Sequence, residues 1–523
     1  MSSVPAERGA ERCAAYPFDH PHLGSHDEVV RLIGGKGASL WAMTRLGIPT
    51  PPGFTIAAGE CERFLKYGLD DALRRGIREQ LARVEADLGR RFGDPANPLL
   101  LSVRSGAAVS MPGMMDTVLN VGFTRDVFEA LHARPALRSF ALDSYSRFLK
   151  MFGTIVLGIE FAAYDEAATV EACARRHDTI VAAVGERFDD AFAQLEMCVD
   201  AVFRSWYSPR AKFYRQHERL DEGAGTAVTI QAMVFGNRDA ESGTGVVFSR
   251  DPSTGAPGAC GDFMAVAQGE DVVAGTHRSR PLRELGETLP AVYESLCAAV
   301  DKLERYYRDM CDVEFTIESG RLWILQARPG KRSPRAAARI AVELAEDPRF
   351  ELTRAGALAR VPPELLSDGD AGERRIATSD AALGRGIGVS PGIAEGIAIL
   401  DPDRAVARAE DGEPIILVRN ETSPADIHGM GVSAGIVTAL GGQMSHAALV
   451  AREWAIPAVC GVETLAVGAD SFEIAGVTYP EGTRIAIDGR TGDVYLGSVE
   501  TVAVAADPYV AVLKAWSREA SPG

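Results

Sequence analysis

The sequence lacks the marks of a membrane-bound or exported protein. It contains no apolar run of about 18 residues or more, the length that a membrane-spanning helix requires. Its first residues, MSSVPAERGAERCAAYPF, hold neither the apolar stretch nor the cleavage pattern of a signal peptide. Its 8 cysteines are scattered without a C-x-x-C pair, so neither a zinc site nor a disulfide framework is expected. We therefore expect a cytoplasmic protein that makes no membrane contact.

The chain also has little positive charge. Lys and Arg number 55 against 72 Asp and Glu, which gives a net charge of -17. This balance argues against a nucleic-acid-binding protein, whose surface would be basic. It does not exclude ATP, because a phosphate site needs only a few local cations and backbone amides.

Length and residue patterns favour several domains of mixed structure. The 523 residues would make three or four units at roughly 150 residues each. Residues 1–335 mix helical and strand patterns, residues 336–383 have the pattern of a helical linker, and residues 384–505 hold short apolar strands between Gly, Pro and Asp turns. Residues 506–523 form a C-terminal tail that we expect to be helical. The predicted fold class is α/β and α+β, with several domains.

Two glycine-bearing segments near the N-terminus are suited to phosphate. In IGGKGASL, Lys36 lies among glycines, ahead of a helix expected over residues 38–46. Glycine lets a backbone approach a phosphate closely, and a helix N-terminus favours an anion. In SVRSGAAVSMPGMMDT, an apolar strand leads Arg104 into a turn and a loop that contains Gly113. Arg suits bidentate phosphate contact. An ordinary glycine turn and a Met-rich core turn stay open as alternatives.

Two further segments predict β-hairpins. SGTGVVFSRDPSTG has a strand between two glycine-containing turns. In DVEFTIESGRLWILQARPG, alternation places Asp312 and Glu314 on one strand face, and a Ser-Gly turn reverses the chain. This hairpin brings Glu314 and Gln326 together, as oxygen ligands suited to Mg²⁺ on ATP phosphates. Arg328 would stabilise charge during transfer. A plain exposed hairpin is the alternative.

The segment TALGGQMSHAALVAREWAIPAVCG carries the most specific pattern. A strand ends at Gly441 and Gly442, and Ser445 can cap a helix that ends before Pro457. His446 would lie at the helix start, where amides and the dipole stabilise a phosphate on the imidazole. A neutral imidazole is a competent nucleophile. A surface or capping histidine is the alternative.

Together these segments resemble the pyruvate phosphate dikinase family, in order and spacing, from about residue 16 to residue 497. GGKGASL, SVRSGAAVSMPGMMDT, GTGVVFSRDPSTG, QGEDVVAG and EFTIESGRLWILQAR are similar to its nucleotide domain. ETSPADIHGM and GGQMSHAALVARE are similar to its phosphohistidine domain. The water-using relative, phosphoenolpyruvate synthase, is matched less well. The resemblance implies an ATP-grasp domain over most of residues 1–335 and a swivelling β/α domain over residues 384–505.

The resemblance also implies a chemistry and a site. In the family, ATP donates its β-phosphoryl group to a histidine, AMP leaves, and the γ-phosphoryl group passes to inorganic phosphate as pyrophosphate. The expected catalytic residues are His446, Lys36, Arg104 and Arg328. The expected nucleotide contacts are Lys36, Arg104, Gly113, Gly243, Gly245, Asp262, Gln326 and Arg328. The expected Mg²⁺ ligands are Asp312, Glu314 and Gln326.

Three departures from the family pattern qualify this expectation. The sequence ends at Gly523 without the family's barrel for pyruvate and phosphoenolpyruvate, so we expect a separate barrel protein or a small-molecule acceptor to receive the phosphoryl group. Met444 stands where the family usually has a Thr, which is a regulatory phosphorylation site in plant relatives. Asp262 stands where the family often has Glu. A homodimer is also compatible with the pattern.

Two other functions remain open. One is a small-molecule kinase of the rifampicin phosphotransferase type, which joins the same two kinds of domain. Against it, no large acceptor domain is inserted between residues 335 and 384. The other is a regulatory phosphocarrier that binds nucleotide without turnover to AMP.

Overall fold

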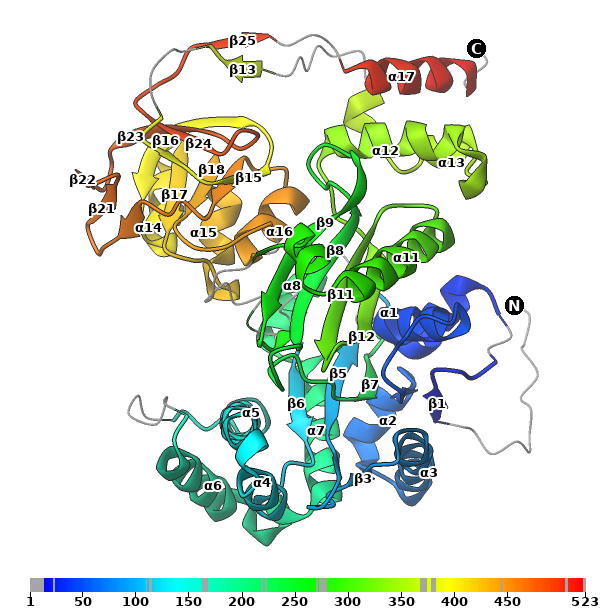
Figure 1. Ribbon diagram of the computed structural model, residues 1–523. Helices are drawn as coiled ribbons and strands as arrows, with labels where there is room; N and C mark the ends of the chain where they lie inside the picture. Colours follow the sequence, from blue (N-terminus) through cyan, green and yellow to red (C-terminus); the bar gives the residue numbers. More distant parts are fainter. Residues whose placement is uncertain are drawn as a thin grey trace. The chain divides into compact units, whose positions relative to one another are not determined.

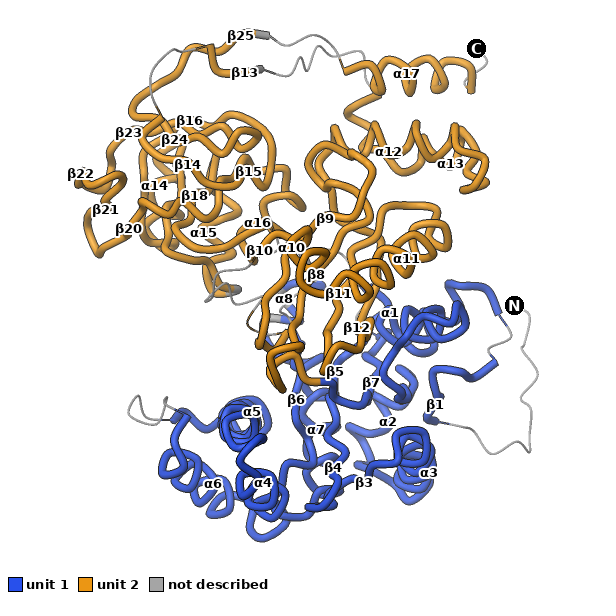
Figure 2. The backbone as a smooth tube through the Cα atoms, viewed as in Figure 1, with its two compact units in different colours: residues 1–234 blue, residues 235–523 orange. Residues whose placement is uncertain are grey.

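The chain forms two units in the computed structural model, Met1–Val234 and Phe235–Gly523 (Figure 2). The residues that the structure describes are 14–21, 24–109, 111, 115–161, 168–217, 220–221, 223–269, 271, 280–366, 374–377, 382–443, 445–503 and 507–520.

A five-stranded antiparallel sheet forms the centre of the first unit, in the order β1-β2-β7-β5-β6 (Figure 1). β5 (Leu101–Gly106) and β7 (Ala227–Ala232) are buried along their whole length. Helices α1 (His26–Arg45) and α7 (Ala191–Ser205) pack against both strands, which accounts for this burial. The strand predicted to carry Arg104 is thus confirmed.

The remaining elements of the first unit are mostly helices. Its other strands are β1 (Ala15–Pro17), β2 (Gly53–Ile56), β6 (Thr117–Val121) and the short pair β3 (Arg91–Phe92) and β4 (Pro98–Leu99). Its other α-helices are α2 (Glu60–Tyr67), α3 (Asp71–Leu88), α4 (Arg125–His132), α5 (Arg138–Met151), α6 (Val170–Val184) and α8 (Pro209–His217).

The second unit begins with another five-stranded antiparallel sheet, in the order β10-β9-β8-β11-β12. Both predicted hairpins are confirmed. The strands are β8 (Gly243–Arg250), β9 (Pro257–Ala265), β10 (Arg280–Pro281), β11 (Cys311–Glu318) and β12 (Arg321–Pro329). α10 (Arg283–Thr288) precedes α11 (Pro290–Tyr307), which packs against β8, β11 and β12.

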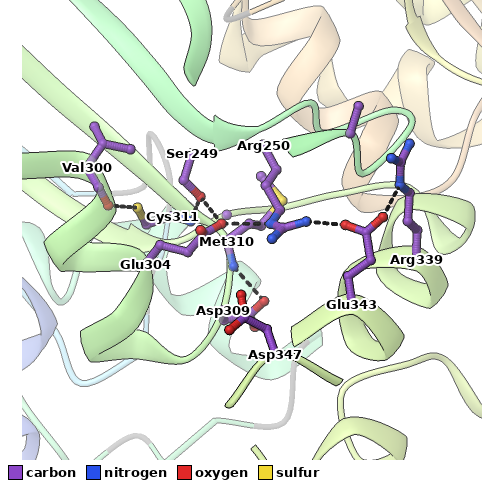
Figure 3. A network of polar contacts seen from close by, with 12 residues as sticks. Ser249, Arg250, Val300, Glu304, Asp309, Met310, Cys311, Arg339, Glu343 and Asp347 are labelled. Carbon is purple, nitrogen blue, oxygen red and sulfur yellow. Dashed lines mark hydrogen bonds and ion pairs between the residues drawn. The ribbon is translucent and has the colours of Figure 1, made fainter. Parts of the chain in front are cut away.

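A buried polar network ties helix α12 (Pro334–Glu346) to this sheet (Figure 3). Arg250, the last residue of β8, donates from Nε to Glu304 Oε1 of α11 at 2.8 Å. It also donates from Nη1 to Glu343 Oε2 of α12 at 2.5 Å, and Arg339 holds the other oxygen of Glu343 at 2.7 Å. Because a buried guanidinium is costly unless it is paired, these bonds fix α12 to the sheet.

Helix α12 also belongs to a small helical bundle with α13 (Arg354–Leu358) and α17 (Pro508–Ala520). A shared apolar cluster holds the bundle together and includes Leu513 and Trp516 of α17. Both the helix expected at the start of the linker and the helix expected in the C-terminal tail are confirmed.

An eight-stranded sheet follows, in the order β14-β24-β23-β16-β17-β18-β19-β15 (Figure 1). Its central strands β16 to β19 run parallel, which requires crossover connections. The strands are β14 (Gly384–Arg385), β15 (Ile387–Ser390), β16 (Ile393–Ile399), β17 (Ile415–Arg419), β18 (Gly435–Thr438), β19 (Ala458–Cys460), β23 (Arg484–Asp488) and β24 (Asp493–Leu496). The helices of this part are α14 (Pro402–Glu410), α15 (Ile427–Val432) and α16 (His446–Glu453).

Two smaller sheets complete the second unit. One is β20 (Leu465–Val467), β21 (Ser471–Ile474) and β22 (Val477–Pro480). The other pairs β13 (Arg374–Ile376) with β25 (Thr501–Ala503), just before and just after the eight-stranded sheet along the chain. The predicted mixed α/β fold with several domains is confirmed. No helix within the described ranges is long and apolar enough to cross a membrane.

Candidate active site

Lys36 lies on α1, close to the end of strand β5. The helix starts earlier than expected, because Ser25 and Glu28 form a capping box at its N-terminus. It is interrupted at Gly34, where φ is 70° and an added Cβ would lie 1.8 Å from the carbonyl oxygen of Gly106. Only glycine permits this close approach. The approach brings Lys36 next to Gly106, since a Cβ added to Gly106 would lie 3.7 Å from the Cβ of Lys36.

Arg104 lies on β5, two residues before Gly106 and therefore on the same strand face. Its side chain is buried, and Nη2 donates to Oε1 of Gln231 on β7 at 2.6 Å. The amide Nε2 of Gln231 donates to the carbonyl oxygen of Pro51 at 3.0 Å. The first unit thus brings Lys36 and Arg104 to the same end of β5.

The β11–β12 hairpin carries the predicted metal-side residues. Glu314 and Gln326 are cross-strand partners, as expected from the alternation. Asp312 faces Arg328 in the same hairpin, and Arg328 donates from Nε and Nη2 to Asp312 Oδ2 at 3.0 and 2.8 Å. Burial raises the pKa of the Asp312 carboxyl, and the Arg328 charge opposes that shift. One face of the hairpin therefore holds oxygen ligands beside a guanidinium group.

Gly243 and Gly245 lie on β8. A side chain at either position would point to the sheet face opposite the one that bears Glu314. An added Cβ would come within 2.4 Å of the Phe263 ring at Gly243 and within 2.7 Å of the Phe315 ring at Gly245. Packing against these two rings accounts for glycine at both positions. A nucleotide contact there remains a prediction, as it does for Gly113, which lies outside the described residues.

His446 is the first residue of α16, and Ser445 is its N-cap, as predicted. The imidazole is half-buried, and its Nδ1 lies 3.1 Å from the hydroxyl oxygen of Thr422. Burial lowers the pKa of the imidazole, and the Asp426 carboxylate opposes that shift. The lowered pKa favours a neutral ring at neutral pH, and Nδ1 is the ring nitrogen that Thr422 engages. Met444, the departure from the family pattern, lies outside the described residues.

The far end of α16 contacts the sheet that carries the hairpin. Leu449 packs against an apolar cluster that includes Phe248 of β8. The Arg452 guanidinium is buried, with Cζ 5.5 Å from the centre of the Phe248 ring. Glu453 forms an ion pair with Lys331, just after β12. Helix α16 therefore joins the His446 loop to the strands of the hairpin.

The loop before His446 reaches the same sheet. Burial raises the pKa of the Asp262 carboxyl on β9, and the nearby backbone of Gln443 opposes that shift. Arg452 in turn donates from Nη2 to the carbonyl oxygen of Gln443. Asp262 and Glu314 are both cross-strand partners of Val246 on β8, so the two carboxylates lie on the same face of the sheet. We call the contacts of Gln443, Leu449, Arg452 and Glu453 with this sheet the docking contact.

Two family models match the chain. The one described as "Pyruvate phosphate dikinase, AMP/ATP-binding domain" matches residues 30–85, 69–293 and 289–347. The one described as "PEP-utilising enzyme, mobile domain" matches residues 411–492. The chain belongs to the pyruvate phosphate dikinase family.

Curated members of this family match over most of the chain. Pyruvate, phosphate dikinase of Giardia intestinalis is 41% identical over 503 residues, which covers 90% of this chain and 56% of the relative. That of Rhizobium meliloti (strain 1021) is 42% identical over 520 residues, 91% of this chain and 57% of the relative. A chloroplastic one from Mesembryanthemum crystallinum is 42% identical over 494 residues, 90% of this chain and 52% of the relative. The chain thus spans about half the length of these relatives. The cytoplasmic location remains a prediction.

The hairpin suits the magnesium ion that accompanies ATP. Glu314 and Gln326 offer a carboxylate and an amide oxygen at paired positions, and Mg²⁺ usually binds through one or two such side chains plus phosphates and waters. Asp312, the third predicted ligand, is buried and bonded to Arg328. Within the described part of the chain, no group of three or more His, Cys, Asp or Glu could hold a metal ion. Glu314 and Gln326 therefore fit a magnesium ion whose other ligands are phosphates and waters.

Several residues of this dikinase-family site were missed from the sequence. Gln231 could have been singled out because it and Thr229 are the polar residues of the otherwise apolar strand AVTIQA. Thr422 and Arg452 lie in ETSPADIHGM and VARE, segments that carried the resemblance without an assigned role. The Lys331–Glu453 pair joins residues far apart in the sequence and left no local signal.

Proposed function

We propose that this chain transfers the β-phosphoryl group of ATP to His446, with AMP and pyrophosphate as products. The docking contact is the observation that carries the proposal. Through Asp262 and Gln443, it sets the loop that precedes His446 against the sheet face that bears Glu314. A nucleophile and a metal-side carboxylate on one face are what transfer from a metal-bound nucleotide requires.

The transfer balances in two displacements. Nε2 of His446 attacks the β-phosphorus, the α–β bridge breaks, and AMP leaves with the bridging oxygen. Inorganic phosphate then attacks the γ-phosphorus, the β–γ bridge breaks, and pyrophosphate leaves. The β-phosphoryl group stays on the imidazole.

The predicted cations and metal-side residues each have a role in these steps. Lys36 and Arg104 hold the phosphates of the nucleotide, as neighbouring cations at the end of β5. Glu314 and Gln326 would hold Mg²⁺, which neutralises phosphate charge when bound. Arg328 stabilises charge on the transferring group while Asp312 fixes its orientation.

Thr422 orients the nucleophile. When Nδ1–H of His446 donates to the Thr422 hydroxyl, the lone pair lies on Nε2. The lowered pKa keeps that lone pair free of a proton at neutral pH. The imidazole is thereby ready for attack without a separate general base.

The proposal keeps the domain division expected from the sequence, with a nucleotide domain over residues 1–335, a linker over residues 336–383 and a histidine domain over residues 384–505. β13 precedes the histidine domain, β25 lies at its C-terminal end, and the ribbon that they form would act as its hinge. Movement about this hinge would carry the phosphorylated histidine to an acceptor. That acceptor would be pyruvate on a barrel domain or a small molecule.

A positional label tests the proposal. The protein is incubated with Mg²⁺, inorganic phosphate and ATP labelled at either the β- or the γ-phosphorus. We expect label on the protein from β-labelled ATP alone, with equal amounts of AMP and pyrophosphate released. ADP as the product, or protein label from γ-labelled ATP in the presence of phosphate, would contradict the proposal. Nucleotide binding without AMP would favour the regulatory phosphocarrier instead.

A further inference from the structure

Gln231 links Arg104 to the segment that leads into β2. It lies on β7 between β2 and β5, opposite Gly53 on one side and Ser102 on the other. Its Nε2 donates to the carbonyl oxygen of Pro51, just before β2. Its Oε1 accepts from Nη2 of Arg104 at 2.6 Å.

The orientation of this amide has only one consistent solution. A flipped amide would point its NH₂ group at the guanidinium, donor against donor, and its oxygen at a carbonyl oxygen, acceptor against acceptor. Gln231 is 2% exposed, so water cannot replace either lost bond. The Pro51 carbonyl therefore fixes the amide, and the amide fixes the guanidinium of Arg104.

We propose that Gln231 is a positioning residue that aims the Arg104 guanidinium at the nucleotide phosphates without reducing its charge. The proposal rests on the proposed role of Arg104 as a phosphate contact. A neutral amide oxygen accepts a hydrogen bond from a guanidinium without placing a negative charge beside it. Arg328 in the same chain donates instead to a charged acceptor, the carboxylate of Asp312.

A double-mutant cycle separates positioning from packing. Gln231→Met removes both bonds of the amide at nearly constant volume. The rate of histidine labelling is measured for this variant, for Arg104→Ala and for the double variant. We expect Gln231→Met to slow labelling about tenfold, as loss of an orienting partner does at other sites. On the Arg104→Ala background it should cause no further loss.

Gln194 supplies a matched control in the same unit. It is fully buried, and its amide accepts from the Gly122 N–H at 2.9 Å and donates to the Phe188 carbonyl oxygen at 2.6 Å. Gln194→Met therefore loses two buried bonds without touching Arg104. It should lower the melting temperature as Gln231→Met does and leave the labelling rate unchanged.

Charge is tested with Gln231→Glu, which keeps an acceptor but adds a negative charge beside Arg104. We expect it to bind ATP more weakly than Gln231→Met does. Wild-type labelling in Gln231→Met, or equal losses with and without Arg104, would overturn the positioning role. Wild-type ATP affinity in Gln231→Glu would overturn the need for a neutral acceptor. If the wild-type chain binds ATP but is never labelled, the proposed function fails. The positioning role of Gln231 is then tested by measuring ATP affinity for the same three variants.

Discussion

Reversing one charge in the docking contact should slow phosphorylation of His446 without weakening ATP binding. Glu453→Lys replaces the ion pair with Lys331 by two like charges, at the end of the helix that begins with His446. The Lys331 side chain is 30% exposed and the Glu453 side chain is 35% exposed. Such a pair is worth about 0.2–1 kcal/mol, and a like-charge pair costs a similar amount.

The reversal should therefore cost about 0.5–2 kcal/mol of docking free energy. At about 1.4 kcal/mol per tenfold change, the equilibrium constant for docking falls about 2-fold to 30-fold. When docked and undocked states start close in free energy, the docked population then falls by about 1.5-fold to 15-fold. A domain that carries a phosphoryl group between two sites needs docked and undocked states of similar free energy. The initial rate of labelling should fall by the same factor and recover in the double variant Lys331→Glu, Glu453→Lys.

The assay is rapid-quench labelling with β-labelled ATP, next to equilibrium dialysis for ATP affinity. Glu519→Lys is the matched control, because it reverses an ion pair of the helical bundle, with Arg354 at 3.0 Å, away from the docking contact. The difference between Glu453→Lys and wild type should shrink in high salt, which screens exposed charges. Wild-type labelling in Glu453→Lys, or no recovery in the double variant, would refute this account of docking.

Three further predictions concern the site. Lys36→Ala, Arg104→Ala and Gln326→Ala should each slow labelling by about 10²-fold. Lys36→Ala and Gln326→Ala should keep the wild-type melting temperature, whereas Arg104→Ala should lower it because Gln231 Oε1 loses its buried donor; wild-type labelling rates in all three would remove them from the site. Because burial lowers the pKa of His446 from its usual 6.5, the labelling rate should stay level through that pH and fall only in more acidic solution; a fall centred at 6.5 or above would contradict this. Thr422→Val should slow labelling at least about tenfold by releasing Nδ1, with ATP affinity intact; an unchanged rate would show that Thr422 does not orient the ring.

The hairpin and the start of α16 were predictable because both are set by neighbouring residues. The Ser-Gly turn and the apolar alternation fix the register that pairs Glu314 with Gln326. Ser445, a good N-cap residue before a run of helix formers, fixes the start of the helix at His446.

The prediction that the helix after Lys36 starts at residue 38 was wrong, and the reason is again local. The glycines at 34 and 35 indicated a turn ahead of a helix, and the turn exists as a break at Gly34. The capping box of Ser25 and Glu28 starts a helical stretch before that break. A signal for the earlier start was thus present in the sequence.

The contacts between distant segments could not be predicted. Nothing near Glu453 in the sequence indicates Lys331, and nothing near Asp262 indicates Gln443. Such pairs depend on how helix α16 and the loop before it pack against a sheet that is distant in the sequence. Local periodicity does not encode this packing. For the same reason, the sequence alone could not assign Gln231 to Arg104.

The most direct test of the central claim is the site of the phosphoryl label. Wild type and His446→Asn are incubated with β-labelled ATP, Mg²⁺ and phosphate, and the labelled peptide is mapped after alkaline quench. Asn tolerates helix N-terminal and turn positions, so the variant should fold and bind ATP as wild type does. We expect an acid-labile, base-stable label on the His446 peptide of wild type and none on His446→Asn. A label of the same stability that persists in His446→Asn on another residue would contradict the account.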